Sequence, residues 1–341
     1  MTPSAWRDSH GLGRWFYREA GDEHAPTLRR LFENPSVPCH LDAEGAKAHL
    51  GLRALDAETT CFAGIKAVRP GCVLFRREGR WIQEPVPPPA PEGELLDLLA
   101  SVLEEAIAPG TALALGGGLD SALLLAVIRR VLGKDVPVFS SCPSIPGYSE
   151  RESVLASARS LDAKPELLGA TERDFVEALS PCVEFAEVPL YNLHPVSKLL
   201  LARGLKERGI RRVITGDGAD QVFAGVPGWD YLPIVGALFA GAGVALSCPF
   251  LHPRVSAWAA NRADPSKSAL REVARRLLPA RLADAPKVGQ LAPVMDLSGV
   301  AESHSVELAR RTLGLDACGG KPDVRAVSLA LLFQHFPRLL G

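Results

Sequence analysis

The period of the apolar positions changes along this chain, and the change predicts where helices and strands lie. Strands are predicted where short apolar runs occur, at 111–115, 135–141, 165–168 and 211–215. Helices are predicted between and after these runs where apolar residues recur at helical spacing, at 94–107, 122–132, 149–161, 196–208, 268–278, 300–313 and 323–336. This alternation predicts an α/β fold, a doubly wound parallel sheet with helices on both faces and a helical C-terminal part.

The N-terminal part follows a different pattern. Short apolar runs between 61 and 82 are punctuated by Pro70-Gly71 and Gly79, which predicts strands and hairpins. A proline-rich stretch follows and predicts a stiff extended linker. We therefore expect a small β-rich unit at 1–84, a linker at 85–92 and a larger unit at 93–341.

Composition narrows the class of protein. The chain has 38 basic and 39 acidic residues, a balance that gives no electrostatic footprint for nucleic acid or an anionic membrane. Its seven cysteines are scattered and form no Cys-x-x-Cys pair, so we expect reduced, buried thiols. The apolar stretch 234–246 is shorter than the roughly 20 residues of a membrane span and predicts a buried helix or pocket wall. With no apolar export segment at the N-terminus, these features favour a cytoplasmic protein.

A glycine loop follows the strand predicted at 111–115. Gly116, Gly117 and Gly118 lack Cβ atoms, and we expect them to adopt backbone angles closed to other residues and to let a polyphosphate approach the next helix. Asp120 is placed to hold Mg²⁺, and Ser121 to donate to a phosphate oxygen. A glycine loop alone is weak support, because turns use glycine for conformational reasons as well.

A second acidic loop follows the strand predicted at 211–215. There Gly216 is followed by Asp217 and Asp220. In an open parallel sheet, ligands bind at the carboxyl ends of strands where the winding direction reverses, so the two loops are expected to share one nucleotide. Asp120 and Asp220 would then hold Mg²⁺ against its phosphates. Helix capping or turn formation is the alternative for both aspartates of this loop.

These residues carry a family resemblance. The glycine loop resembles the Ser-Gly-Gly-x-Asp-Ser pyrophosphate loop of the ATP pyrophosphatases. The stretch Gly216-Asp-Gly-Ala-Asp-Gln-Val-Phe-Ala-Gly225 resembles the second signature of asparagine synthetase. Further similarities lie at 249–251, 267–271 and 327–333, so the resemblance covers the synthetase domain from about residue 93 onward.

The first unit also resembles that family, because 61–75 is similar to the stretch that closes its N-terminal glutaminase domain. The glutaminase uses a cysteine directly after the initiator methionine. This chain begins Met1-Thr2, and its first cysteine is Cys39. We therefore expect a truncated glutaminase-like unit that does not hydrolyse glutamine. Its truncation suggests an exposed sheet edge, covered by a second copy or a partner protein.

The resemblance implies ATP-dependent amide formation through an acyl-adenylate, with Mg²⁺ and ATP bound by the loop residues, Gly216 included. Lys287 matches the lysine that stabilises developing negative charge. Lys267 is the second candidate for this catalytic role, and Arg271 is a possible phosphate partner. Asp217 occupies the position of the family's acid and is expected to accept a proton from the amine.

Several positions depart from the family pattern. Gly116 replaces the first serine of the pyrophosphate loop, and Gln221, Ala224, Val226 and His252 change the acceptor side. These departures favour a changed substrate, a peptide or specialised metabolite, as in the lasso-peptide cyclases and β-lactam-forming relatives. The alternatives are an ammonia-dependent asparagine synthetase and a degenerate, non-catalytic module that binds a nucleotide or a partner.

Overall fold

The computed structural model describes residues 2–90, 92–228, 230–260, 262–286, 291–315 and 323–340. Five parallel strands form its central sheet in the order β11-β10-β7-β8-β9. Their bounds are β7 (Thr111–Ala114), β8 (Val138–Ser141), β9 (Glu166–Leu168), β10 (Arg212–Ile214) and β11 (Ala245–Ser247). The predicted α/β class and parallel sheet are confirmed, although the strands are shorter than predicted and β11 lies in the apolar stretch where only a helix or pocket wall was expected.

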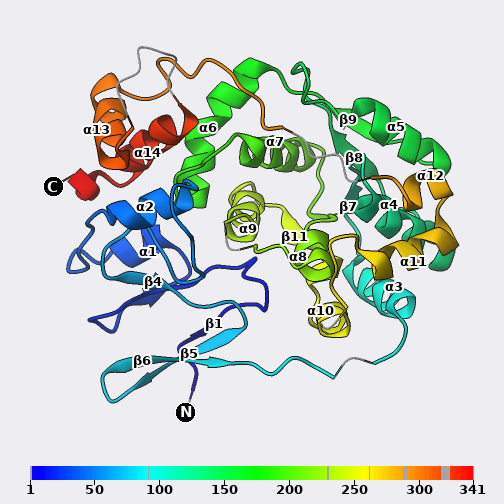
Figure 1. Ribbon diagram of the computed structural model, residues 1–341, viewed down its shortest axis with the longest axis horizontal. Coiled ribbons are helices and arrows are strands. Elements are labelled where there is room, and N and C mark those ends of the chain that lie inside the picture. Colours follow the sequence, from blue (N-terminus) through cyan, green and yellow to red (C-terminus); the bar gives the residue numbers. More distant parts are fainter. Residues whose placement is uncertain are drawn as a thin grey trace.

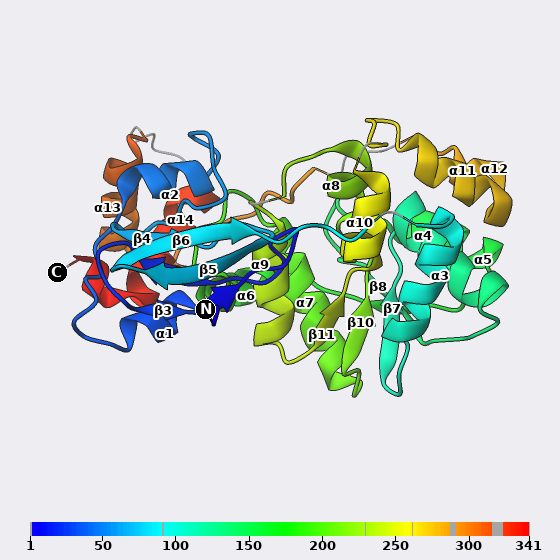
Figure 2. The same ribbon diagram turned by 90° about the horizontal axis from the view of Figure 1, so that it is seen from below.

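Alternate strand residues face opposite sides of this sheet. Ala112 and Val213 belong to an apolar cluster with α7 (His194–Glu207) and α9 (Leu232–Gly241). Leu113 and Ile214 belong to the cluster on the other face. That cluster is shared with α3 (Leu95–Ala106), α4 (Leu119–Ala126), α5 (Arg151–Ser160), α8 (Ala219–Ala224), α10 (Pro253–Ala259), α11 (Ser268–Leu277) and α12 (Ala280–Ala283). Figure 2 shows the sheet edge-on between these helices. The two-residue period of a strand thus sorts the core into two layers.

The winding direction reverses between β7 and β10. The chain runs from β7 outward through β8 to β9, then crosses back to pair β10 with the other side of β7. Thr111 pairs with Arg212 and Leu113 with Ile214, so these two strands end at the same level. The loops that follow them therefore meet at the switch point, as the sequence predicts.

The N-terminal part is built from two small antiparallel sheets, β1-β5-β6 and β3-β2-β4. Their strands are β1 (Ala5–Trp6), β2 (Phe16–Arg18), β3 (His24–Ala25), β4 (Ile65–Ala67), β5 (Cys72–Arg77) and β6 (Arg80–Pro85). The β5–β6 hairpin confirms the predicted β-rich character, and α1 (Leu28–Phe32) and α2 (Ala43–His49) are helices that the pattern did not predict. Trp6, on edge strand β1, is 65% exposed. A partner at this edge stays a prediction.

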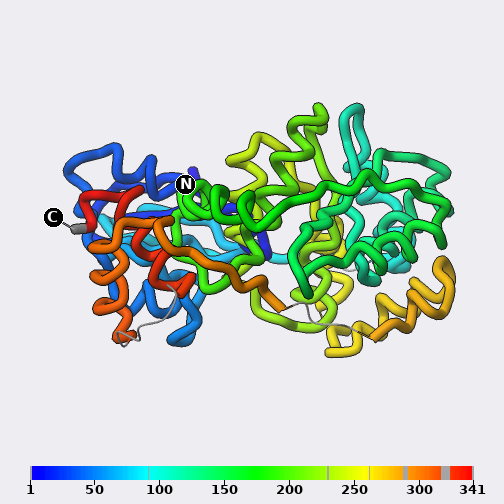
Figure 3. The backbone as a smooth tube through the Cα atoms, turned by 90° about the horizontal axis from the view of Figure 1, so that it is seen from above, coloured from blue at the N-terminus to red at the C-terminus, as the bar shows by residue number. Residues whose placement is uncertain are grey.

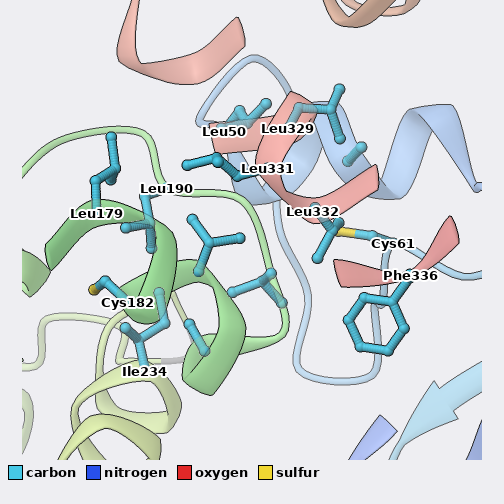
Figure 4. Packing of buried hydrophobic residues seen from close by; sticks show 14 of the residues in the cluster. Leu50, Cys61, Leu179, Cys182, Leu190, Ile234, Leu329, Leu331, Leu332 and Phe336 are labelled. Atoms are coloured by element: carbon cyan, nitrogen blue, oxygen red, sulfur yellow. The ribbon is translucent and has the colours of Figure 1, made fainter. Parts of the chain in front are cut away.

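The N-terminal part shares its main core with segments far away in sequence. Leu50 and Cys61 belong to one apolar cluster with Leu179 and Leu332, as Figure 4 shows. The latter two residues lie in α6 (Glu172–Ala186) and α14 (Val324–His335), and α13 (Ser303–Leu313) packs against α14. Figure 1 places these helices beside α1 and α2, and Figure 3 shows residues 291–302 running from the middle of the molecule to α13. The units expected at 1–84 and 93–341 therefore share one core.

Some local predictions are wrong. The helix predicted at 149–161 spans only 151–160; Glu150 is the N-cap residue of α5 and makes no side-chain cap bond. The helix predicted from 196 begins two residues earlier, at His194, because Pro195 is favourable in the first turn of a helix. The six cysteines in the described ranges are free and buried, as predicted. None of the helices within these ranges is long and apolar enough to cross a membrane.

Candidate active site

The glycine loop between β7 and α4 is folded by Ser121. The amide of Gly116 donates to Ser121 Oγ at 2.9 Å, which turns the loop back toward the start of α4. Gly118 is the N-cap residue and provides no side chain, so the first amides of the helix lack a side-chain cap. Helix N-termini of this kind attract anions.

The reason for the glycines differs from the expected one. None of Gly116, Gly117 and Gly118 has a positive φ, so the loop does not use the left-handed angles that glycine can adopt. Space is the reason at Gly117, where a Cβ would lie 2.6 Å from the Cβ of Ser153. At Gly116 a Cβ would make ordinary contacts, the nearest with Ser121 Oγ at 3.6 Å.

The acidic loop between β10 and α8 contacts the glycine loop directly. A Cβ on Gly216 would lie 3.0 Å from the backbone N of Ser121 and 3.1 Å from the Cβ of Asp120, so this close approach favours glycine. Gly218 caps α8 in a left-handed conformation with φ +95°, which also favours glycine. The two predicted loops therefore form one site.

Lys267 joins the two predicted metal ligands. Its Nζ lies 2.9 and 2.8 Å from the two oxygens of Asp120 and 2.9 Å from Oδ1 of Asp220. Lys267 is buried and has φ +54°, immediately before α11. The carboxylates thus converge as predicted, and a lysine ammonium bridges them.

The fit of these residues to Mg²⁺ follows from their chemistry. Two carboxylates that converge on one cation provide the hard oxygen ligands that Mg²⁺ prefers, with phosphate oxygens and water completing its shell. No group of three or more His, Cys, Asp or Glu side chains forms a metal site within the described ranges. Asp120 and Asp220 therefore fit a metal that is bound together with a phosphate ligand and after Lys267 has moved.

Asp217 is held by two further residues. Lys198 Nζ donates to both of its carboxylate oxygens at 2.9 Å, and the Tyr231 hydroxyl donates to Oδ1 at 2.9 Å. Burial opposes both charges of the ion pair, but the attraction between them outweighs it, so the pKa of Lys198 is raised and that of Asp217 is lowered. Burial and the neighbouring carboxylate raise the pKa of Tyr231. In this state Asp217 is a poor proton acceptor.

A cavity of about 650 Å³ connects these groups. It is lined by both loops and by residues of α7 and its surroundings, among them Tyr148, Glu150 and His194. Glu150 accepts a hydrogen bond from the amide of Gly117 at 3.2 Å, and so places a carboxylate on the glycine loop. The Tyr148 hydroxyl lies 3.0 Å from Nδ1 of His194.

One predicted residue lies elsewhere, and a second is not described. Arg271 does not line the cavity; its guanidinium donates to the carbonyls of Ser266, Ala283 and Ala285 at 2.8, 2.7 and 3.0 Å. It therefore anchors the segment after α12 in this state, and a phosphate contact stays a prediction. Lys287 lies outside the described residues.

Lys198 and Tyr231 were missed by the sequence analysis. A signal was present for Lys198, because His194, Ser197 and Lys198 have the i, i+3, i+4 spacing of one helical face, and all three line the cavity. No comparable signal marks Tyr231, which reaches Asp217 only through the packing of α9.

One family model and two curated relatives match parts of this chain. Residues 110–239 match the asparagine synthase family, a range that contains both loops and Lys198. Two curated relatives are each 26% identical to this chain. The match to "Amidase chry2" of Gibberella zeae covers 49% of this chain and 30% of that protein. The match to "Amidase chyE" of Penicillium rubens covers 33% of this chain and 19% of that protein. The chain thus spans less than a third of the length of these relatives.

Solved structures give a weaker likeness. NMN synthetase from Francisella tularensis has a TM-score of 0.36 at 15% identity. The match covers 72% of this chain and 90% of the synthetase chain. NH3-dependent NAD synthetase from Campylobacter jejuni has a TM-score of 0.36 at 16% identity, with the same coverage. From β7 to α9, this chain matches the asparagine synthase family.

Proposed function

We propose that this protein is an ATP-dependent ligase that forms an amide bond through an acyl-adenylate, without using glutamine. The observation that carries the proposal is the meeting of the glycine loop and the acidic loop at the switch point of the sheet. That arrangement combines an open helix N-terminus for phosphate with two converging carboxylates for a metal. The match to the asparagine synthase family supports the same class of chemistry.

The reaction would take place in two steps. An oxygen of the substrate carboxylate attacks the α-phosphorus of ATP, and the bond from that phosphorus to the bridging oxygen breaks, which releases pyrophosphate. An amine nitrogen then attacks the acyl carbon, the bond from that carbon to the adenylate oxygen breaks, and AMP and a proton leave. The amides at the start of α4 and Ser121 would hold the pyrophosphate. Bound through Asp120 and Asp220, Mg²⁺ would supply charge neutralisation for the phosphates.

The acyl substrate we propose is a peptide or specialised metabolite. Gln221, where the family usually has glutamate, lines the cavity on the acceptor side. The cavity of about 650 Å³ is also lined by Tyr191 and Asn192, so it extends beyond the two loops. Space of this kind suits an amine-bearing substrate larger than ammonia, including one that closes on itself as a lactam.

Two observations favour the alternative, a nucleotide-binding module without turnover. Lys267 occupies the position proposed for the metal, and Glu150 accepts a hydrogen bond from the amide of Gly117 in the glycine loop. Trapping with hydroxylamine distinguishes the two functions. Incubation with ATP, Mg²⁺, hydroxylamine and a panel of carboxylic acids and peptides should give hydroxamate and equal amounts of AMP and pyrophosphate. Nucleotide binding with no pyrophosphate from any acid would favour the module.

A further inference from the structure

Lys198 has a special place among the charged residues of the cavity. Of the described residues that line it, Lys198 is the one lysine or arginine. The acids of the lining are Asp120, Glu150, Asp217, Asp220 and Asp230. A substrate carboxylate that enters such a cavity is repelled by most of the charges around it. Lys198 is the lining residue with a permanent positive charge to attract it.

The neighbours of Lys198 keep it charged and in place. Both carboxylate oxygens of Asp217 accept hydrogen bonds from it at 2.9 Å, and Tyr231 donates to the same carboxylate. The Asp217 side chain is 8% exposed and the Lys198 side chain 27% exposed. Since the carboxylate is the deeper of the two, the lysine is the member of the pair that offers more surface to the cavity.

The position of Lys198 also fits the reacting carboxylate. Its partner Asp217 directly follows Gly216, which is in contact with the backbone of Ser121 in the glycine loop. A carboxylate bound near Lys198 is therefore next to the loop that we propose holds the phosphates. The same site shows that one lysine ammonium can bridge two carboxylates, as Lys267 does with Asp120 and Asp220.

We propose that Lys198 binds the carboxylate of the acyl substrate and stays in contact with its oxygen in the acyl-adenylate, while Asp217 and Tyr231 are positioning residues. The inference rests on the proposed function and deepens it, because it assigns the acyl site. It also changes the role of Asp217 from the expected proton acceptor to a holder of the lysine. The Lys198 ammonium would attract the substrate carboxylate before the reaction and stabilise the acyl oxygen during it.

The test uses three defined probes and isothermal titration of the full chain. They are Mg·ATP, 5′-O-sulfamoyladenosine and its N-acetyl derivative, which mimics acetyl-adenylate and differs from the second probe only in the acyl group. Lys198→Met should weaken binding of the N-acetyl derivative about tenfold or more. Its affinity for the other two probes should change by less than about twofold. Lys206→Met, an exposed lysine on the same helix, is the matched control and should change none of them.

Loss of the lysine leaves Asp217 buried without its counter-ion, so Lys198→Met alone can fail to fold. The double variant Lys198→Met/Asp217→Asn removes both charges and should fold, bind Mg·ATP and show the same selective loss of the acyl probe. An equal loss for all three probes, or no loss, would overturn the role of Lys198. The role of Lys198 would also be overturned if the wild-type protein binds Mg·ATP but not the N-acetyl derivative. If wild-type protein does not bind Mg·ATP, the proposed function itself fails.

Discussion

Lys267 Nζ lies 2.8 Å from Oδ2 of Asp120, in the position where the two loops converge on a cation. The same ammonium lies 2.9 Å from Oδ1 of Asp220. A metal that enters between these carboxylates has to displace the lysine, so we expect Lys267 to compete with Mg²⁺ for the same ligands. Phosphate groups favour the exchange, because they give the displaced ammonium a new counter-ion.

Lys267→Met should therefore increase metal affinity in the absence of nucleotide. With the ammonium removed, Asp120 and Asp220 repel one another and bind a divalent cation more tightly, by about tenfold or more. Binding of Mn²⁺ alone, followed by electron paramagnetic resonance, measures this directly. Lys134→Met, which removes a partly exposed lysine paired with Glu104, is the control. Equal Mn²⁺ affinity in Lys267→Met and wild type would contradict the competition.

Asp120→Asn should weaken Mg²⁺-dependent binding of ATP. The variant keeps the shape of the side chain but loses the charge that we propose holds the metal, with an expected loss of roughly 10- to 100-fold in affinity. Titration with ATP in the presence and absence of Mg²⁺ measures it. Asp135→Asn, at an exposed carboxylate paired with Arg129, should bind ATP like wild type. Magnesium dependence that survives in Asp120→Asn would rule out this ligand.

Gly116→Ser should strengthen binding of ATP or pyrophosphate. The nearest contacts of a new Cβ are ordinary, 3.6 Å to Ser121 Oγ and 3.7 Å to Glu150 Oε2, so the serine of the related pyrophosphate loops fits here. A hydrogen bond to a charged group is worth about 1.5 to 3 kcal/mol, which sets the upper range of the gain. Gly117→Ala is the matched contrast and should destabilise the loop, since its Cβ would lie 2.6 Å from Ser153. Similar behaviour of the two variants in pyrophosphate titrations would refute this account of the loop.

His49 should make the free energy of unfolding fall as the pH is lowered from about 6.5 to 4. Burial lowers the pKa of its ring to about 4, while the unfolded chain keeps the ordinary value near 6.5. The unfolded state therefore binds the proton first, and stability that is fully present above pH 6.5 is lost as the pH falls. The shift corresponds to roughly 3 kcal/mol.

Urea unfolding at pH 7 and pH 4.5 measures the effect of His49, with His49→Gln as the comparison. Other groups titrate in the same range, so the informative quantity is the difference between the two proteins. Wild type should lose more stability than His49→Gln over this interval. Equal losses would show that the ring at position 49 does not carry the pH dependence.

The sequence by itself determined the class of fold and the two loops. The apolar pattern is that of a strand before the glycine loop and that of a helix after it. These local preferences agree with the global fold. The same reasoning placed Asp120 and Asp220 together, because strands of a doubly wound sheet bring their carboxyl ends to one edge. The sequence does not predict β11, since a strand of three residues beside an apolar stretch is too short to show a period.

The tertiary structure alone decided which charges meet. Lys267 and Asp120 are 147 residues apart, and their contact depends on how α11 packs beside α4. Tyr231 reaches Asp217 only because α9 lies against α7. Likewise, the apolar residues of 1–84 do not reveal that α6 and α14 complete their core. Periodicity specifies which face of an element is buried, but the partner on that face is set by long-range packing, which no local pattern encodes.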